Sequence, residues 1–114
     1  MNASPPVSHE TRYRLLNHLA AQPETTQREL ARALGISLGK ANYCLRALVA
    51  KGLLKVRNFG ESRNKAAYAY VLTPSGVKEK IRVTREFLRR KIEEHERLTQ
   101  EIDALRAEVG RQTE

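Results

Sequence analysis

The segment 37–51, SLGKANYCLRALVAK, carries polar side chains at a spacing that would place them on one face of an α-helix. At about 100° per residue, one side of such a helix collects small and apolar residues: Ala41, Cys44, Leu45, Leu48 and Val49. The opposite side collects Gly39, Tyr43, Arg46 and Ala50, with Lys40 and Asn42 on its flanks. Two cations, an amide, a phenol and a residue without a side chain therefore share the outward face.

These residue types are the ones that read base edges in duplex DNA. An α-helix fits the major groove, where Arg or Lys bonds guanine and Asn bonds adenine. Arg46, Lys40 and Asn42 are therefore the candidate base readers. Gly39 lets the backbone approach the duplex, and Tyr43 suits a thymine methyl group or a phosphate oxygen. The alternative is an ordinary solvated helix face, and the neighbouring elements decide between the two.

The residues before this segment predict a second helix joined to it by a tight turn. Thr26, with Glu29 three residues later, forms a capping-box pattern. Gly35 is placed where a left-handed residue would end that helix. Ser37 is the expected cap of the next helix, and with the first N–H groups of that helix it can hold a phosphate. Only Gly35, Ile36 and Ser37 join the two helices, a connection typical of a helix-turn-helix.

Further elements on both sides complete a winged helix. Ser8 is the expected cap of a first helix, which Pro23 ends. After the third helix, residues 53–57 (LLKVR) and 66–72 (AAYAYVL) predict two short strands. The turn-rich segment 58–65 (NFGESRNK) lies between them. Three helices followed by a basic-tipped hairpin predict a mainly α fold with a small β-hairpin, an α+β winged helix-turn-helix domain.

Several basic residues outside the third helix are expected to contact the DNA backbone. In the hairpin, or wing, Arg57, Arg63 and Lys65 suit phosphate contacts or the minor groove. At the start of the second helix, Arg28 lies where such motifs cross the backbone, and Gln27 could join it there. The remaining arginines of the first two helices are weaker candidates: Arg12, Arg14 and Arg32.

The chain beyond the wing predicts one long helix over residues 74–110. Thr73 is a suitable cap and Pro74 a suitable first residue. Side chains spaced as in a heptad predict a dimerisation stripe formed by Ile81, Leu88, Ile92, His95, Leu98, Ile102, Leu105 and Val109, with Phe87 widening it. At about 1.5 Å per residue such a helix is too long to fold back on a domain this small. It is expected to pair with a second copy.

These elements divide the chain into a tail (1–7), a DNA-binding domain (8–73), a dimerisation helix (74–110) and a frayed end (111–114). Parallel pairing is weakly favoured because Glu101 would face Arg106 of the other copy. His95 is a poor core residue. It could set the register, sense pH, or lie outside the true seam. Cys44 is expected to be a small buried hydrophobe, with a redox role as the alternative.

Composition narrows the function classes. The chain has 114 residues, which suits one small domain with an arm, and a net charge of +8 with a pI of about 10.1. Of that charge, +7 belongs to residues 1–72 and +1 to residues 73–114, so the winged helix carries the attraction for a polyanion. We find no secretory signal, no membrane span and one cysteine, which favours the cytosol. Catalytic motifs and metal-ligand spacings are missing, so neither an enzyme nor a cofactor is expected.

Four stretches of the sequence resemble a known family: TRYRLLNHLA, TQRELARALGISLGKANYCLRALVAKGLLKVRNF, NKAAYAYVLTPSGVKEKI and FLRRKIEEHERL. They are similar to small MarR-family transcriptional regulators associated with bacterial exopolysaccharide gene clusters. The resemblance implies a dimeric, sequence-specific transcription factor without catalytic activity. It assigns Ser37, Gly39, Lys40, Asn42, Tyr43 and Arg46 to the recognition helix, and Arg63, Asn64 and Lys65 to the wing. The chain lacks the extensive helical dimerisation region of larger MarR proteins, whose effector pocket is therefore not expected, and any small-molecule effector is unknown.

Two binding functions compete with DNA recognition. A winged helix can serve as a protein-interaction module, with its C-terminal helix docked in a larger complex. RNA binding is disfavoured because the sequence shows no aromatic stacking platform.

Overall fold

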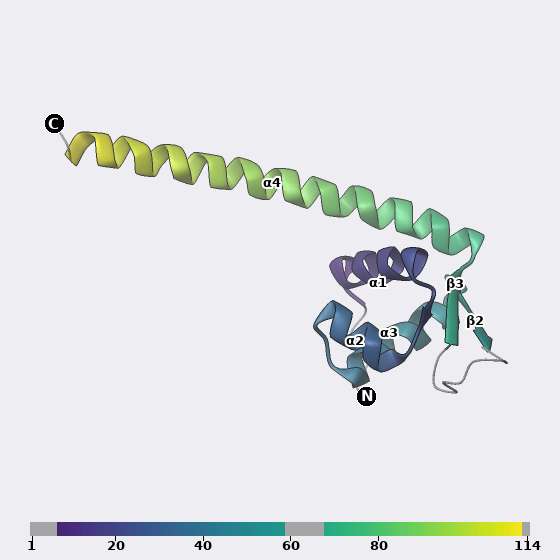
Figure 1. The fold of residues 1–114 in the computed structure, drawn as a ribbon. Helices are drawn as coiled ribbons and strands as arrows, with labels where there is room; N and C mark the ends of the chain where they lie inside the picture. The colour runs from purple at the N-terminus through teal and green to yellow at the C-terminus, as the bar shows by residue number, and fades with distance from the viewer. Residues whose placement is uncertain (1–6, 59–67, 113–114) are drawn as a thin grey trace, which may run out of the picture.

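The computed structural model describes residues 7–58 and 68–112. Its elements, in chain order, are α1 (His9–Ala21), β1 (Glu24–Thr25), α2 (Gln27–Leu34), α3 (Leu38–Ala50), β2 (Leu54–Asn58), β3 (Tyr68–Leu72) and α4 (Pro74–Gln112). Helix α1 lies between α4 and the α2–α3 pair, and the strands lie at one end (Figure 1). The mainly α winged-helix fold is confirmed.

The helix boundaries follow from local capping. Ser8, Thr26 and Ser37 each accept a hydrogen bond from the backbone N–H three residues later, at 3.0–3.2 Å. Each satisfies a donor that the first turn of a helix leaves free. Gly35 ends α2 in the left-handed conformation, with φ of 67°, which a residue with a side chain rarely adopts. The caps and the three-residue turn are thus as predicted.

The sheet contains a strand that the sequence did not predict. Its order is β1-β3-β2, with both pairs antiparallel, so β3 is central. Strand β1 has two residues, and the neighbouring Pro23 carbonyl accepts from Tyr70 N at 2.9 Å. Two residues are too few to show an alternating pattern. The predicted two-stranded hairpin is therefore a three-stranded sheet.

The core joins the three short helices to the sheet. Leu15, Leu16 and Leu19 of α1 are fully buried, as are Leu30 of α2 and Leu48 of α3. Leu54 and Tyr70 close the cluster from the sheet. Ile36, in the turn between α2 and α3, packs against it as expected. This packing fixes the orientation of α3 relative to the sheet.

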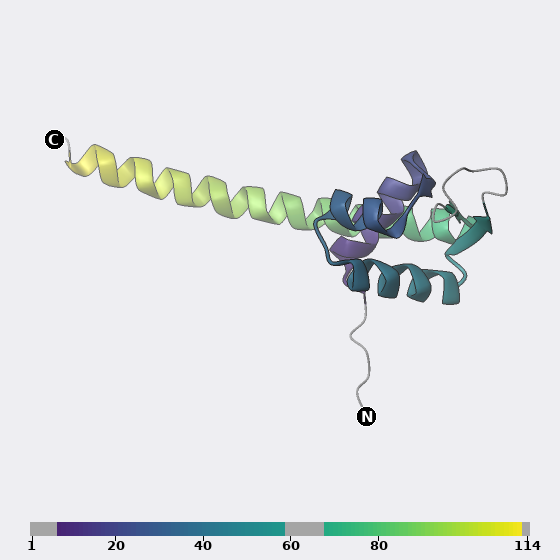
Figure 2. The ribbon, with the colours of Figure 1, turned by 60° about the horizontal axis from the view of Figure 1, so that its bottom comes forward.

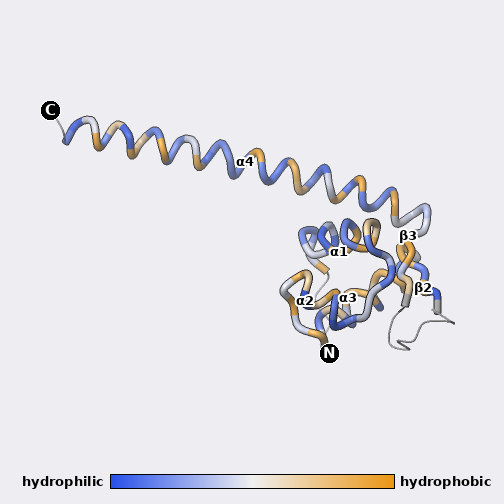
Figure 3. Tube along the Cα trace, in the orientation of Figure 1, coloured by the Kyte–Doolittle hydropathy of each residue, from blue (hydrophilic) through white to orange (hydrophobic). Residues whose placement is uncertain are grey.

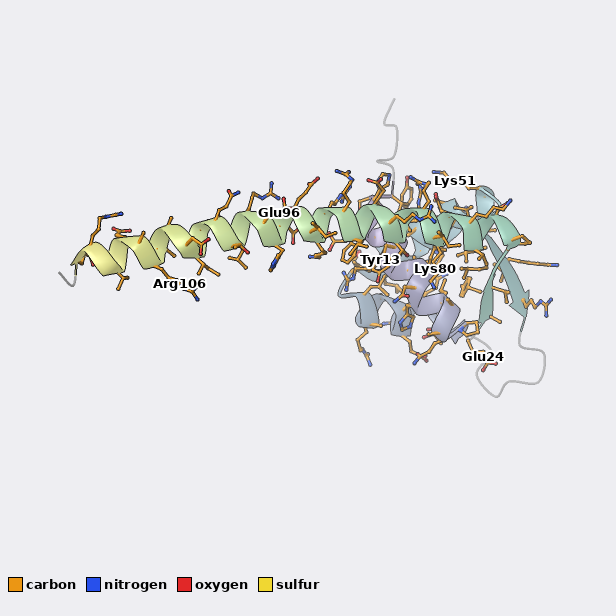
Figure 4. All side chains as sticks on the ribbon, turned by 90° about the horizontal axis from the view of Figure 1, so that it is seen from above. Tyr13, Glu24, Lys51, Lys80, Glu96 and Arg106 are labelled. Atoms are coloured by element: carbon orange, nitrogen blue, oxygen red, sulfur yellow. The ribbon has the colours of Figure 1, made fainter. Side chains whose placement is uncertain are left out.

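The first part of α4 belongs to the same core. Val83 is fully buried, and the Phe87 ring stacks on Tyr13 of α1 with centroids 4.5 Å apart. In the view from above in Figure 4, the labelled Tyr13 lies beneath α4. Phe87, which was expected to widen the dimerisation stripe, is half-buried and packs one side of its ring against α1.

The second part of α4 projects from the domain. In both ribbon views it extends well beyond the other elements (Figure 2), and the molecule measures 71 × 33 × 27 Å along its principal axes. Every residue from Leu88 to Gln112 is exposed. The helix continues to Gln112, two residues past its predicted end.

Candidate nucleic-acid interface

Helix α3 separates its two faces almost as the sequence predicts. Ala41, Cys44, Leu45 and Leu48 are buried, whereas Gly39, Lys40, Tyr43 and Arg46 are exposed. Val49 is the exception, because it was expected on the buried side and is 36% exposed. It lies on the flank of the helix that faces the sheet, and there it lines an open groove instead of the core.

The described residues do not neutralise the two cations on α3. Within residues 7–58 and 68–112, the side chains of Lys40 and Arg46 have neither a hydrogen bond nor an ion pair. In α4, by contrast, Arg82, Arg89 and Lys91 each form an ion pair with a nearby glutamate. Both charges are therefore available to a polyanion such as the backbone of a duplex.

Asn42 and Gln27 lie together rather than apart. Asn42 Nδ2 donates to Gln27 Oε1 at 3.0 Å, and both residues are half-buried. The sequence suggested Asn42 as a base reader and Gln27 as a backbone contact, without a link between them. Only the packing of α2 across α3 brings these side chains within reach.

An open groove runs beside the outward face of α3. Its volume is about 410 Å³, and its lining residues are Gln27, Leu45, Arg46, Val49, Ala50, Val56 and Tyr70. Tyr70 forms the buried floor, and Val56 brings the sheet to the opposite wall. The groove lies between α3 and the sheet.

The predicted backbone contacts fall into three groups. Arg28 at the start of α2 is exposed, as is Arg57 on β2. Ser37 holds the first turn of α3 through Lys40 N, which leaves other N–H groups of that turn for a ligand. Arg63, Asn64 and Lys65 lie outside the described residues.

Arg12 is not available to DNA, contrary to the sequence-based suggestion. It is 8% exposed, and its guanidinium pairs with Glu79 of α4 at 2.5 Å. Glu79 also accepts from Arg82. Hydrogen bonds from Arg82 and Arg12 hold the pKa of the Glu79 carboxyl below its usual range. Arg12 therefore fastens α1 to α4.

The predicted dimerisation stripe is uncovered along α4. Its apolar members are 39–60% exposed, and hydrophobic segments recur along the helix in Figure 3. A shallow groove of about 290 Å³ near the far end is lined by Ile102, Leu105, Arg106 and Val109. Val77 is 49% exposed, fits the same heptad one turn before Ile81, and was missed. His95, the polar member of this stripe, is also exposed.

Two other kinds of site find no support in the described part of the chain. No group of His, Cys, Asp and Glu side chains there could hold a metal ion. None of its helices combines the length and apolar character needed to cross a bilayer.

Residues 8–55 match a family described as winged helix-turn-helix DNA-binding. No curated protein sequence matches the chain. Among solved structures, the PcaV transcriptional regulator from Streptomyces coelicolor is 22% identical with a TM-score of 0.62, covering 73% of this chain and 57% of that one. The adhesin competence repressor AdcR from Streptococcus pyogenes is 21% identical with a TM-score of 0.62, covering 79% and 64%.

A mutant of MarR from E. coli, solved in complex with operator DNA, is 22% identical with a TM-score of 0.55, covering 65% of this chain and 51% of that one. At these identities the likeness shows a shared fold. The chain spans between 51% and 64% of the length of these three structures.

Proposed function

We propose that this chain is a sequence-specific, double-stranded DNA-binding transcriptional regulator of the MarR type that acts as a homodimer. The observation that carries the proposal is the exposed, unneutralised polar face of α3 within a winged-helix domain. The fold shared with a regulator solved on operator DNA supports it. A regulator of this kind works in the cytoplasm and catalyses no reaction.

In this proposal α3 lies in the major groove. Arg46 and Lys40 bond guanine edges, Asn42 bonds adenine, and each good bidentate contact contributes about 1–3 kcal/mol of discrimination. Gly39 allows close approach of the backbone. Tyr43 lies on the same exposed face and completes the set of readers.

Contacts around α3 fix its register on the duplex without reading bases. Arg28 reaches a phosphate from α2, and the first turn of α3 at Ser37 holds another. Arg57 extends the contact to the wing, as do the wing-tip residues of the sequence prediction. Because these contacts release condensed counterions, they make affinity strongly dependent on salt.

Pairing through α4 supplies the second half of the interface. In a parallel pair both winged helices lie at the same end, and Glu101 of one copy faces Arg106 of the other. Two recognition helices then address half-sites about 34–36 Å apart, or a multiple of that distance. On the sequence resemblance alone, we propose exopolysaccharide genes as the target.

The direct test selects bound duplexes from a random pool at stated salt concentrations. The wild type should enrich a two-fold symmetric sequence. Arg46→Ala should relax the preference at one base position in each half-site. Arg57→Ala should instead weaken all sequences alike and reduce the salt slope by about one unit. Arg90→Ala, which removes an exposed charge from α4, is the matched control and should change neither.

A protein-interaction module would behave differently. It would enrich no sequence, and neither Arg46→Ala nor Arg57→Ala would change its weak, salt-sensitive attraction to duplexes relative to Arg90→Ala. That result would replace the proposed function.

A further inference from the structure

The hydrogen bond between Asn42 and Gln27 links a base-reading position to the neighbouring helix. Gln27 is the first residue of α2, whereas Asn42 lies in the second turn of α3. Their side chains meet at 3.0 Å from Nδ2 to Oε1, and both are half-buried. The bond therefore spans the helix-turn-helix at the edge of the proposed interface.

The chemistry of the two amides shows what this bond leaves free. A carboxamide has two N–H donors and one carbonyl acceptor. Asn42 gives one N–H to Gln27, so its second N–H and its Oδ1 remain. That donor and acceptor pair is what a bidentate contact with adenine requires. The intramolecular bond and the base contact are thus compatible on one side chain.

The bond also restricts how Asn42 can turn. Without a partner, its side chain would sample several rotamers, and the terminal amide would rotate almost freely. With Gln27 in place, the orientation is selected before DNA arrives, so less ordering remains for the binding step. An Asn42 amide held in one orientation also discriminates better against other bases, because it cannot rotate to bond them.

We propose that Gln27 is a positioning residue for Asn42, so that preference for one base pair belongs to the two amides together. This inference rests on the proposed function, because it concerns how that interface reads sequence. Gln27 Nε2 has no hydrogen-bond partner among the described residues, and it remains available for a phosphate. Gln27 thus couples the orientation of the Asn42 side chain to the position of the DNA backbone.

The experiment repeats the duplex selection with Asn42→Ala, Gln27→Ala, the double variant and Gln27→Glu. Asn42→Ala and Gln27→Ala should relax the same base position, with a loss of discrimination of about tenfold. The double variant should relax it no further than Asn42→Ala does, because the two residues act as a unit. Affinities for the selected duplex and for its single-base variants give these ratios.

Gln27→Glu separates positioning from general structural support. Its carboxylate can still accept from Asn42 Nδ2, and a negative charge at the start of α2 favours the helix. It should therefore retain the base preference. Its overall affinity should fall for all sequences, since the charge lies near phosphate and the amide donors are lost. Arg28→Ala, one residue away, is the matched control and should lower affinity without altering preference.

Three results would overturn the inference. Gln27→Ala could keep the full preference while Asn42→Ala loses it, or the two variants could relax different positions. Either result would leave the proposed function standing if Arg46→Ala still relaxes its own position. If the wild type selects no sequence at all, both proposals fail together.

Discussion

Cys44 and Lys40 lie one turn apart on α3 but meet opposite environments. Cys44 is 1% exposed, and desolvation raises the pKa of its thiol from 9.0, although the charge of Lys40 acts in the other direction. Burial thus favours the neutral thiol over the thiolate, and at neutral pH the uncharged side chain contributes its packing to the core. That contribution is lost only as the pH rises through the folded-state value. A reactive thiolate is therefore disfavoured in the native protein.

We expect alkylation of Cys44 at pH 8 to be at least about tenfold slower in the folded protein than in denaturant, because the reagent must wait for local opening. Mass spectrometry over a time course measures the two rates. Mild oxidant should leave duplex affinity unchanged. Rapid labelling of the folded chain, together with loss of duplex binding, would instead establish the redox role.

The Glu79 carboxylate of α4 forms ion pairs with Arg82 of the same helix and with the buried Arg12 of α1. The negative charge of Glu79 therefore holds α1 against α4. We expect Glu79→Gln to lower the free energy of unfolding by roughly 2–3 kcal/mol at pH 7, because Arg12 loses its counter-charge. The pKa of Glu79 is depressed below 4.5. Its contribution is thus present above that pH and disappears as the pH falls through the folded-state value.

Urea unfolding at pH 7 and at pH 3 tests this expectation. The difference between wild type and Glu79→Gln should shrink at the lower pH. Glu86→Gln is the control, because Glu86 pairs with Arg89 on the open surface and its loss should change little. A pH-independent difference for Glu79→Gln would show that its charge is not the cause.

At the scale of elements, the start of α4 is fastened to the loop between α3 and β2. Thr73 Oγ1 accepts from Gly76 N at 3.0 Å and donates to Gly52 O. Thr73 N donates to Leu53 O at 3.1 Å. These bonds connect the end of α3 to the start of α4. In the proposed homodimer, this junction would link the spacing of the two α4 helices to the placement of the two α3 helices.

Gly76→Ala should disrupt that junction. A Cβ at this position would collide with the backbone oxygen of Leu53, so α4 or the loop must shift. We expect a loss of about 1–3 kcal/mol in the free energy of unfolding, measured by thermal or urea denaturation. Gly110→Ala is the control, because no atom of the described residues lies within 4 Å of the position of its Cβ. It should be neutral or slightly stabilising, since Ala favours a helix over Gly. Equal behaviour of the two variants would contradict the close packing.

Local signals explain which elements the sequence could predict. The caps at Ser8, Thr26 and Ser37 depend on residues only three apart, so they can be predicted from the sequence without knowledge of the fold. Strand β1 and the stacking of Phe87 on Tyr13 depend on partners far along the chain. The same holds for the Asn42–Gln27 bond, which joins positions 15 apart. The heptad pattern of α4 likewise gives only the spacing of its apolar residues. It does not indicate which turns of α4 are covered by another helix of the same chain.

At the scale of the whole molecule, α4 performs two tasks in succession. Its first turns bury Val83 in the domain, and its remainder carries apolar side chains into solvent. Labelled residues Glu96 and Arg106 lie on a length of helix with no other element beside it (Figure 4). Most helical stability in proteins comes from packing an apolar face. In the proposed homodimer a second copy of the chain supplies such packing, and the parallel arrangement keeps both winged helices together.

Cysteine cross-linking distinguishes the arrangements of that pair. In a Cys44→Ser background, we expect Leu105→Cys to form a disulfide-linked dimer under mild oxidation, because equivalent d positions face each other in a parallel, in-register pair. Ala107→Cys is the control: it points away from the seam two residues later and should cross-link much less. Non-reducing electrophoresis measures both yields, and light scattering checks that each variant is dimeric. In an antiparallel pair, the two copies of residue 105 would be separated along the helices. Dimers that resist cross-linking at Leu105→Cys would therefore contradict the parallel seam and, with it, the placement of two recognition helices on neighbouring half-sites.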